Sequence, residues 1–354
     1  MKKSGLMLAL ILSLTLILSA CGGGAKNNTN APAASPSQPA AGESAAPEAS
    51  KMKIGMSTDT GGVNDKSFNQ SAWEALQQIA QDTGATTKYL ESKGDADMEP
   101  NLRSFVQEKY DLIWGIGFLF SDAMTRAAEQ NPDSNFALID SVVDLPNVTS
   151  VTFAEHEGSF LVGVVAGLTT KTNKVGFVGG IESPTIQKFE AGYVAGVKAA
   201  NPNAEVLIQY AGAFDKPDVG KTIAATQYND GADIIFQAAG ATGTGVFNEA
   251  IERFNAGNKV WVIGVDKDQS LEFGNDVTLT SMMKGVKEAV YKVSSDLING
   301  TLEGGKTITL GLKDNGVGLP ESNPNVPQDV LDKVNEYKEK IVSGEITVPT
   351  TPEE

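Results

Sequence analysis

Short apolar runs alternate with longer segments of helical periodicity from residue 52 onward. In the first half of this region, β-rich runs predict five strands, at 53–57, 86–90, 112–116, 136–140 and 149–153. Helical patterns separate them at 69–83, 99–109 and 122–130. Such alternation is typical of a parallel sheet with crossover helices.

The same pattern repeats in the second half. Strands are predicted at 174–178, 205–210, 233–237, 260–265 and 277–280, with helices at 184–200, 217–229 and 245–255. Two successive sets predict an α/β fold with two doubly wound parallel-sheet lobes. The length agrees, because about 300 residues are too many for one ordinary core.

Three further elements follow, a helix at 284–299, a strand at 308–312 and a helix at 328–343. They let the chain cross between the lobes more than once, which predicts a hinge of several strands. We assign 52–153 plus 281–302 to the N-terminal lobe, and 154–280 plus 303–354 to the C-terminal lobe. Open α/β sheets bind ligands outside the carboxyl ends of their strands, so we expect the loops there to line a cleft.

Residues 1–20 have the pattern of an export signal, with Lys2 and Lys3 before an apolar run. The run is shorter than the roughly 20 residues that span a bilayer, which favours a cleaved signal. Cys21, the sole cysteine, follows Leu-Ser-Ala as in the bacterial lipobox, so we expect it to be lipidated. Several acyl chains anchor a protein stably, whereas one holds it only marginally.

Residues 21–51 complete the N-terminal region. After Cys21 the segment has no aromatic and no large aliphatic side chain, a composition that predicts a disordered linker. A flexible chain of this length reaches about 30 Å. The folded body can therefore stand clear of a membrane and remain near a membrane partner.

Charge excludes one class of partner. The formal net charge is −16, and loss of Lys2 and Lys3 with the signal removes two positive charges and leaves −18. Nucleic acids are bound through clusters of Lys and Arg, so we expect no nucleic-acid partner. Contact between the body and an anionic membrane surface is disfavoured for the same reason.

Catalytic and metal-binding templates fail. His156 is the only histidine, a single cysteine makes a Cys-based zinc site improbable, and no Gly-x-Ser-x-Gly elbow occurs. The segment 215–222 approaches a phosphate-binding loop, but Asp215 replaces its first glycine and repels phosphate. We therefore expect no enzyme activity, no cofactor and no metal.

Acidic and aromatic residues recur just past the predicted strand ends. The candidates for ligand binding are Asp59, Asp65, Phe68, Asn69, Asp140, Phe189, Gly240, Asp266 and Lys284. A flat heteroaromatic ring with a hydroxyl-rich portion fits this set, because aromatic side chains stack on bases and carboxylates accept hydrogen bonds from N–H and O–H groups. Each residue has a structural alternative: Asp59 and Asp65 could cap a helix, and Phe68 and Phe189 could belong to the core.

These residues stand within segments that resemble the basic membrane protein family of substrate-binding lipoproteins, of the purine nucleoside receptor A kind. The resemblance covers about 53–312. It rests on DKSFNQSAW at 65–73, GIGF at 115–118, EHEGSFLVG at 155–163, FEAGY at 189–193 followed by Gly196, GVD at 264–266, and Thr280-Ser281 before Lys284.

The resemblance implies a type I periplasmic-binding fold that closes on a nucleoside and serves an ABC permease and ATPase. It places the base between Phe68 and Phe189, with Asp140 at the base edge. It also implies that Asp59, Asp266, Lys284 and the backbone of Gly240 hold the ribose. The family often has an arginine after the matching lysine, whereas Gly285 stands here.

Two other binding roles remain open. The same fold could take a free sugar or another flat metabolite, in which case ribose would compete as well as inosine. A surface sensor that signals to a membrane kinase is the other alternative, and neighbouring genes for a permease and an ATPase would argue against it.

Overall fold

The computed structural model describes residues 52–352. The signal predicted at 1–20, the linker at 21–51 and the lipidation site at Cys21 lie outside the described residues. The elements below therefore concern the body of the chain.

The first half of the body forms five strands with helices between them, as the alternating pattern predicts. The elements are β1 (Lys53–Thr58), α1 (Phe68–Thr83), β2 (Thr86–Glu91), α2 (Asp95–Gln107), β3 (Leu112–Ile116), η1 (Phe118–Phe120), α3 (Ser121–Gln130), β4 (Asn135–Ile139) and β5 (Val148–Phe153). β1, β3, β4 and β5 are almost wholly buried, which explains their continuous apolar runs.

The second half repeats this arrangement. Its elements are α4 (Glu155–Thr169), β6 (Lys174–Gly179), α5 (Pro184–Ala200), β7 (Glu205–Tyr210), α6 (Pro217–Asn229), β8 (Ile234–Ala238), η2 (Gly240–Thr242), α7 (Gly243–Asn255), β9 (Trp261–Asp266), α8 (Ser270–Phe273) and β10 (Thr278–Lys284). The last part of the chain adds α9 (Val286–Ile298), β11 (Thr307–Leu310), η3 (Leu312–Asp314), β12 (Val317–Gly318) and α10 (Gln328–Val342).

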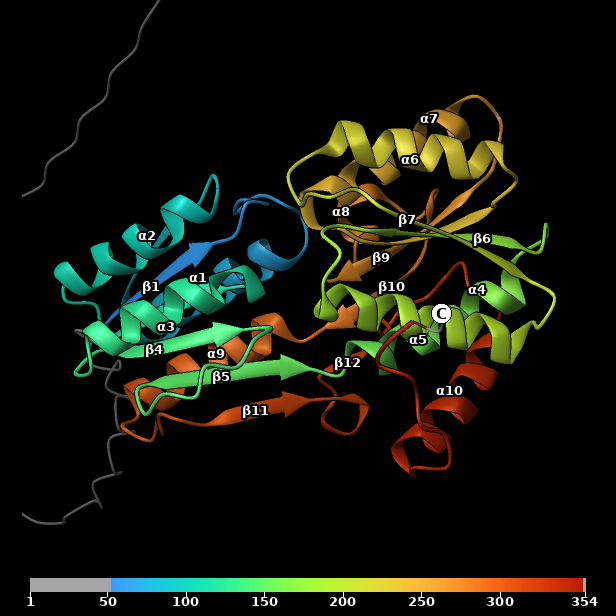
Figure 1. The fold of residues 1–354 in the computed structure, drawn as a ribbon. Helices are drawn as coiled ribbons and strands as arrows, with labels where there is room; N and C mark the ends of the chain where they lie inside the picture. The colour runs from blue at the N-terminus through green and yellow to red at the C-terminus, as the bar shows by residue number, and fades with distance from the viewer. Residues whose placement is uncertain (1–51, 353–354) are drawn as a thin grey trace, which may run out of the picture. The chain divides into compact units, whose positions relative to one another are not determined.

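The strands form two six-stranded sheets, which confirms the two doubly wound lobes (Figure 1). Their orders are β11-β5-β4-β3-β1-β2 and β12-β10-β9-β8-β6-β7, and only the β10–β12 pair is antiparallel. The chain passes between the lobes after β5, after β10 and after β11. Three connections therefore make up the hinge.

The sheet pairing corrects the predicted lobe boundaries in two places. β11 pairs in parallel with β5 in the first sheet, whereas 303–354 was assigned to the C-terminal lobe. β10 stays in the second sheet through Lys284, beyond the boundary predicted after residue 280. The pattern at 308–312 reveals a strand but not its partner, and in Figure 1 β11 lies alongside β5, far from it in sequence.

α4 is a helix that the periodicity did not predict. Most of its residues are buried, so it has no polar face to produce a helical period. It packs closely on α5, and only glycine fits at two positions of the contact. A Cβ at Gly192 would lie 2.1 Å from the carbonyl oxygen of His156, and a Cβ at Gly196 would lie 2.0 Å from the carbonyl oxygen of Phe160. The glycines of both helices thus permit direct backbone contact.

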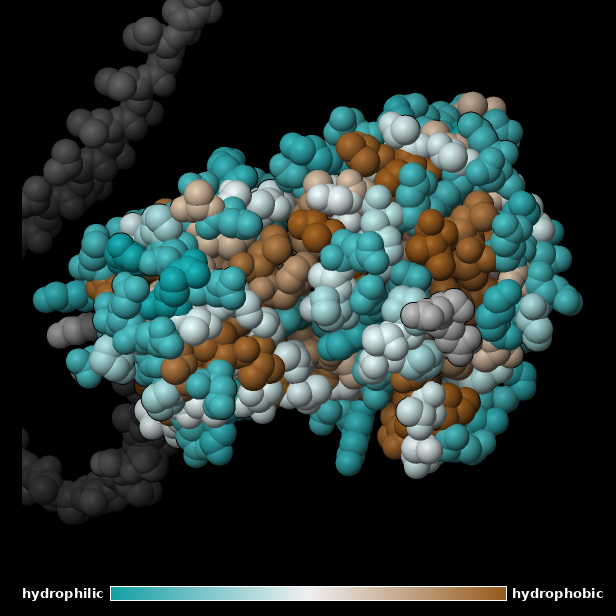
Figure 2. Space-filling model, in the orientation of Figure 1, coloured by the Kyte–Doolittle hydropathy of each residue, from teal (hydrophilic) through white to brown (hydrophobic). Residues whose placement is uncertain are grey.

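The surface carries no continuous apolar belt on the face shown in Figure 2, where hydrophilic residues surround separate hydrophobic patches. Within residues 52–352, no helix combines the length and apolarity needed to cross a bilayer.

Candidate functional site

A cavity lies between the lobes at the carboxyl ends of the strands, and all nine residues predicted from the sequence line it. They are Asp59, Asp65, Phe68, Asn69, Asp140, Phe189, Gly240, Asp266 and Lys284. The remaining lining residues are Gly117, Phe118, Ile186, Phe214, Ala238, Ala239 and Val265. The space between these residues, including its open mouth, is about 470 Å³.

Two phenylalanines reach the cavity from opposite lobes. Phe68 is the first residue of α1, and Phe189 lies on α5, one turn past its start. Their ring centroids lie 5.1 and 5.5 Å from the same atom, Nζ of Lys284. Both rings line the cavity, and both also pack with the hydrophobic core, in which Phe189 is 3% exposed.

Lys284 is the centre of a buried ion cluster beside the hinge. Its Nζ lies 2.6 Å from Oδ2 of Asp140 and 3.2 Å from Oε1 of Glu155, and the other oxygen of Glu155 lies 3.2 Å from Nζ of Lys188. We call these four residues the hinge cluster. Burial alone would lower the pKa of Lys284, but the carboxylates of Asp140, Glu155 and Asp266 together raise it above its ordinary value.

Three carboxyl groups of the cavity wall have a pKa above the ordinary value for aspartate. Burial raises the pKa of Asp59, Asp140 and Asp266 to about 6 in each case. Hydrogen bonds from Asn69 and Gly61 oppose the rise at Asp59, and Lys284 opposes it at the other two. Lys284 carries the only positive charge among the described residues that line the cavity, so the wall is acidic.

Two acceptors on this wall have no hydrogen-bond partner. Oδ1 of Asn69 and Oδ1 of Asp140 are buried and unpaired. Buried polar atoms are normally hydrogen-bonded, because leaving one unpaired costs about 1–3 kcal/mol. These atoms can therefore accept hydrogen bonds from a molecule that enters the cavity.

Asp65 also lies at the wall, but protein donors already occupy its carboxylate. It accepts hydrogen bonds from the backbone N–H groups of Ser67, Asn69 and Gln70 and from the side-chain amide of Asn69. These groups open α1, whose first N–H groups lack partners within the helix. Asp65 thus caps α1, the structural alternative given above, and thereby positions Phe68 and Asn69.

Asp140 and Asp266 occupy equivalent places in the two lobes. Asp140 directly follows β4 and Asp266 ends β9, the fourth strand of each half, and both have left-handed backbone angles, with φ of 68° and 67°. A non-glycine residue in this region carries strain, which often occurs at functional sites. The strained turns aim a carboxylate into the cavity from each side.

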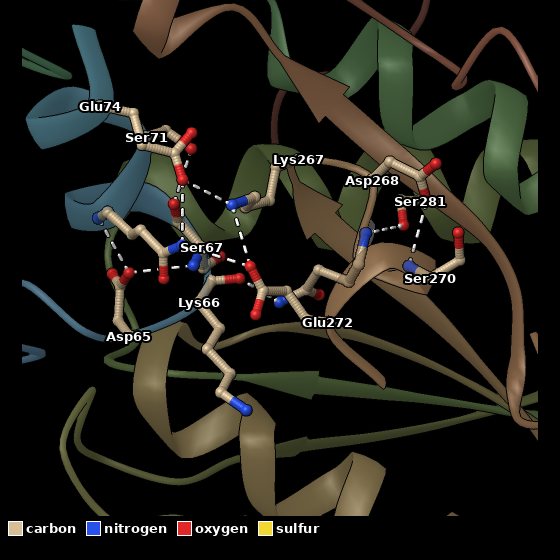
Figure 3. Close-up of polar contacts among 12 residues, drawn as sticks. Asp65, Lys66, Ser67, Ser71, Glu74, Lys267, Asp268, Ser270, Glu272 and Ser281 are labelled. Atoms are coloured by element: carbon tan, nitrogen blue, oxygen red, sulfur yellow. Dashed lines mark hydrogen bonds and ion pairs between the residues drawn. The ribbon is translucent and has the colours of Figure 1, made fainter. Parts of the chain in front are cut away.

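A second polar cluster joins the lobes at the rim of the cavity. Nζ of Lys267 lies 2.9 Å from Glu74 Oε1 and 3.1 Å from Glu272 Oε1 (Figure 3). The Gln70 amide donates to Glu272 at 3.2 Å. We call these four residues the rim clasp. Closer to the cavity, the Ser67 hydroxyl donates to Asp266.

A family model described as ABC transporter substrate-binding protein PnrA-like matches residues 52–352. The chain belongs to the Bmp family of ABC transporter substrate-binding proteins. The resemblance found in the sequence is thereby confirmed. Serving an ABC transporter as its substrate-binding protein is a non-enzymatic role, which implies a small-molecule ligand and transporter partners.

Relatives of this Bmp-family protein cover most of its length. A protein of Listeria monocytogenes named CD4+ T-cell-stimulating antigen is 46% identical over 99% of this chain and 100% of its own. The ABC transporter nucleoside-binding protein BmpA of Lactococcus lactis subsp. cremoris is 44% identical over 84% of this chain and 89% of its own.

A solved structure supports the same fold. An ABC transporter solute-binding protein from Aeropyrum pernix K1 has a TM-score of 0.79 and 28% identity, over 85% of this chain and 94% of its own. The periplasmic-binding-protein-like fold expected for a Bmp-family protein is confirmed.

The residues that were not predicted include two aromatic residues of the cavity wall and one carboxylate behind it. Phe118 and Phe214 line the cavity from opposite lobes, with ring centroids 6.1 Å apart, and both follow strand ends where the cleft rule points. Glu155 lies on an unpredicted helix, and no sequence pattern connects it to Lys284. Within the described body, no group of three or more His, Cys, Asp or Glu is arranged to hold a metal ion.

Proposed function

We propose that this Bmp-family protein binds nucleosides, with a preference for purines, and delivers them to an ABC permease and its ATPase. The observation that carries the proposal is the pair Phe68 and Phe189, placed from opposite lobes around Lys284 and an acidic wall. A planar base can stack on aromatic rings, at about 1–3 kcal/mol per base. The carboxylates then accept hydrogen bonds from base N–H groups and ribose hydroxyls.

Individual roles follow from the contacts. Oδ1 of Asp140 is free to accept from the base edge, and Lys284 can donate to a ribose oxygen. Asp59, Asn69 and Asp266 supply further acceptors, and the backbone of Gly240 completes the ribose side. Asp65 contributes by capping α1.

The charge of the wall supports an uncharged ligand. Buried carboxylates outnumber the one ammonium group among the described lining residues, so a phosphate group entering the cavity would be repelled. We therefore expect nucleosides to bind far more tightly than their 5′-monophosphates. The nucleoside-binding relative of Lactococcus lactis, at 44% identity, is consistent with this ligand class.

Isothermal titration calorimetry tests the proposal. Inosine, guanosine, adenosine and cytidine are titrated into the protein, with ribose and inosine 5′-monophosphate as controls. We expect heat from at least one purine nucleoside and little from either control. Ribose that binds as tightly as inosine would instead identify a sugar receptor, and silence from every nucleoside at micromolar protein would refute the proposal.

We also propose that Cys21 carries the lipid that holds the protein at the outer face of a bacterial membrane. The supporting observation is its position after Leu-Ser-Ala at the end of the apolar run. A Cys21→Ala variant expressed in a bacterium should leave the membrane fraction. Retention of that variant in membranes at the wild-type level would contradict the anchor.

A further inference from the structure

Glu155 is a buried carboxylate that touches the binding machinery without lining the cavity. Only 1% of its side chain is exposed, and it begins α4, immediately after the first hinge connection. Its Oε1 lies 3.2 Å from Nζ of Lys284, which ends β10 at the second connection. One carboxylate therefore links two of the three hinge connections.

The other oxygen of Glu155 forms an ion pair with α5, the helix that carries Phe189. Oε2 lies 3.2 Å from Nζ of Lys188, the residue before Phe189 on α5. Nζ of Lys188 also donates to the backbone carbonyl of Phe153 at 3.4 Å. Glu155 thus connects the lysine that faces the ligand with the helix that carries one of the two stacking rings.

The lysine geometry explains why a second carboxylate is needed. An ammonium group has three donors; that of Lys284 donates a hydrogen bond to Asp140 and forms an ion pair with Glu155 at 3.2 Å. With Asp140 as its sole anion, the ammonium could turn fully onto that carboxylate and occupy both of its oxygens. The charge of Glu155 draws Lys284 back, which leaves Oδ1 of Asp140 unpaired and lysine donors free for the ligand.

We propose that Glu155 is a positioning residue for ligand binding, which holds Lys284 and the Phe189 helix in the arrangement that receives the ligand. The inference rests on the proposed function for the nature of the ligand. Glu155 acts through Lys284 and Lys188 and makes no contact with the ligand itself.

The charge of Glu155 adds a measurable signature. The groups that face it are Lys284 from β10, Lys188 from α5, Asp140 from the end of β4 and Asp266 from the end of β9, while His156 follows it on α4. Glu155 raises the pKa of Asp140 beyond the larger effect of burial. Removing its charge therefore lowers the pKa of Asp140, whereas a purely structural residue would leave that pKa unchanged.

The test compares Glu155→Gln with wild type, using the best-binding nucleoside from the titration series. At pH 7.5 we expect affinity to fall by about tenfold or more, as when one member of a buried charge pair is lost. We also expect the loss of binding in acid to begin at a lower pH than in wild type. Unchanged affinity together with an unchanged pH profile would overturn the inference.

Glu157→Gln is the matched control. It lies on the same helical turn and removes the same charge, but Glu157 accepts a hydrogen bond from the Leu312 backbone N–H, at 2.8 Å, and an amide oxygen can still accept it. Ligand affinity should remain within about twofold, since the proposal assigns this residue no part in holding Lys284. An equal loss in both variants would attribute the effect to α4 as a whole and contradict the specific role.

A ligand-free measurement separates this inference from the proposed function. Buried, ion-paired lysine ammonium groups exchange slowly with water and give resolved signals in ¹H–¹⁵N spectra. The Lys284 signal should be present in both proteins and should move to a new position in Glu155→Gln, because the ammonium turns onto Asp140, whether or not any nucleoside binds. A signal at the wild-type position in the variant would refute the positioning role even if wild type bound nucleosides tightly.

Glu155→Asp keeps the charge and shortens the side chain by one methylene, and it serves if the glutamine variant fails to fold. We expect it to weaken binding while the acid profile stays near that of wild type. Wild-type affinity in this variant would show that the reach of Glu155 to both lysines is not needed.

Discussion

Two ion clusters join the lobes of this protein, and each shares one lysine between two carboxylates. In the hinge cluster, Lys284 is 1% exposed and its partners Asp140 and Glu155 are 6% and 1% exposed, while Lys188, at the outer end of the cluster, is 30% exposed. In the rim clasp, Lys267 is 17% exposed, and Glu74 and Glu272 are 33% and 24% exposed. The distances are similar, so access to water is the main difference.

That difference assigns the two clusters different tasks. Inside the protein each charge has lost its hydration, and removing one partner leaves an uncompensated charge, at a cost of about 3–5 kcal/mol. At the rim, water screens the charges, and such pairs contribute about 0.2–1 kcal/mol. We infer that the hinge cluster decides whether the cavity can accept a ligand, and that the rim clasp adjusts how long the lobes stay closed.

The largest expected effect is that of Lys284→Met. Asp140 and Glu155 would lose their shared cation in a buried site, so unfolding free energy should fall by about 3–5 kcal/mol. Ligand affinity should fall below detection, because the donor that faces the cavity is gone. Urea unfolding and calorimetry measure the two effects.

Lys292→Met provides the control for that variant. Lys292 is 71% exposed and pairs with Asp296 one turn away. Its loss should change unfolding free energy by no more than about 0.5 kcal/mol. If Lys284→Met were equally mild, burial would not distinguish the clusters, and the comparison would fail.

Removal of an aromatic ring next to the hinge cluster should have an intermediate effect. Phe68→Ala takes away a ring whose centroid is 5.1 Å from Nζ of Lys284. Nucleoside affinity should fall by about 1–3 kcal/mol, or roughly 5- to 150-fold, because the base loses its stacking partner. Calorimetry with inosine measures the loss, and an unchanged dissociation constant would show that Phe68 does not stack on the ligand.

Much of the cavity was predictable because topology places strand ends together. Asp59, Asp140 and Asp266 follow apolar runs that could only be buried strands, and parallel strands bring such positions to one edge. The same rule points to Phe118 and Phe214. Neither was selected from the sequence.

Within the hinge cluster, Asp140 and Lys284 were predicted, whereas Glu155 was beyond sequence reasoning for a different reason. Glu155 starts α4, whose apolar residues face protein on all sides and therefore leave no helical period. Its contact with Lys284 joins the start of α4 to the end of β10, two elements that lie far apart in the sequence. The partner of β11 was missed for the same reason, because local patterns identify a strand but not the sheet it joins.

The pH dependence of binding separates the clusters without any mutation. The pKa of Asp59, Asp140 and Asp266 is raised to about 6, and ligand donors favour their ionised forms, so the pKa of each should fall on binding. Affinity should therefore be constant above about pH 7 and should fall as the pH is lowered through the pKa values of the free protein. Once the pH is below the pKa of both the free and the bound state, the total loss is about tenfold for each unit of difference between those two pKa values.

The rim clasp should contribute nothing to this profile. Burial acts to raise the pKa of Glu74, but Lys267, Gln70 and Lys287 together lower it, so Glu74 stays ionised through the same pH range. Calorimetry at pH 6 in buffers of different ionisation enthalpy should show proton release on binding. Proton uptake, or affinity that rises in acid, would mean that protonated carboxyls receive the ligand.

The smallest effect is expected at the rim, with Lys267→Met. The closed lobes would lose two ion pairs that water already weakens, so we expect ligand dissociation to quicken by no more than about fivefold. Association should change little, because the variant leaves the cavity wall intact. Stopped-flow fluorescence measures both rates, and Lys333→Met, which disrupts an exposed pair with Glu336 on α10, is the control.

Salt provides the final distinction between the two clusters. Exposed charges are screened beyond a Debye length of about 10 Å at 0.1 M salt and about 3 Å at 1 M, whereas buried pairs are screened much less. Dissociation from wild type should therefore speed up towards the Lys267→Met rate as salt rises, while the variant itself changes little. If salt increased the dissociation rate equally in wild type and in Lys267→Met, the salt-sensitive contact would lie elsewhere. The rim clasp would then not determine how long the lobes stay closed.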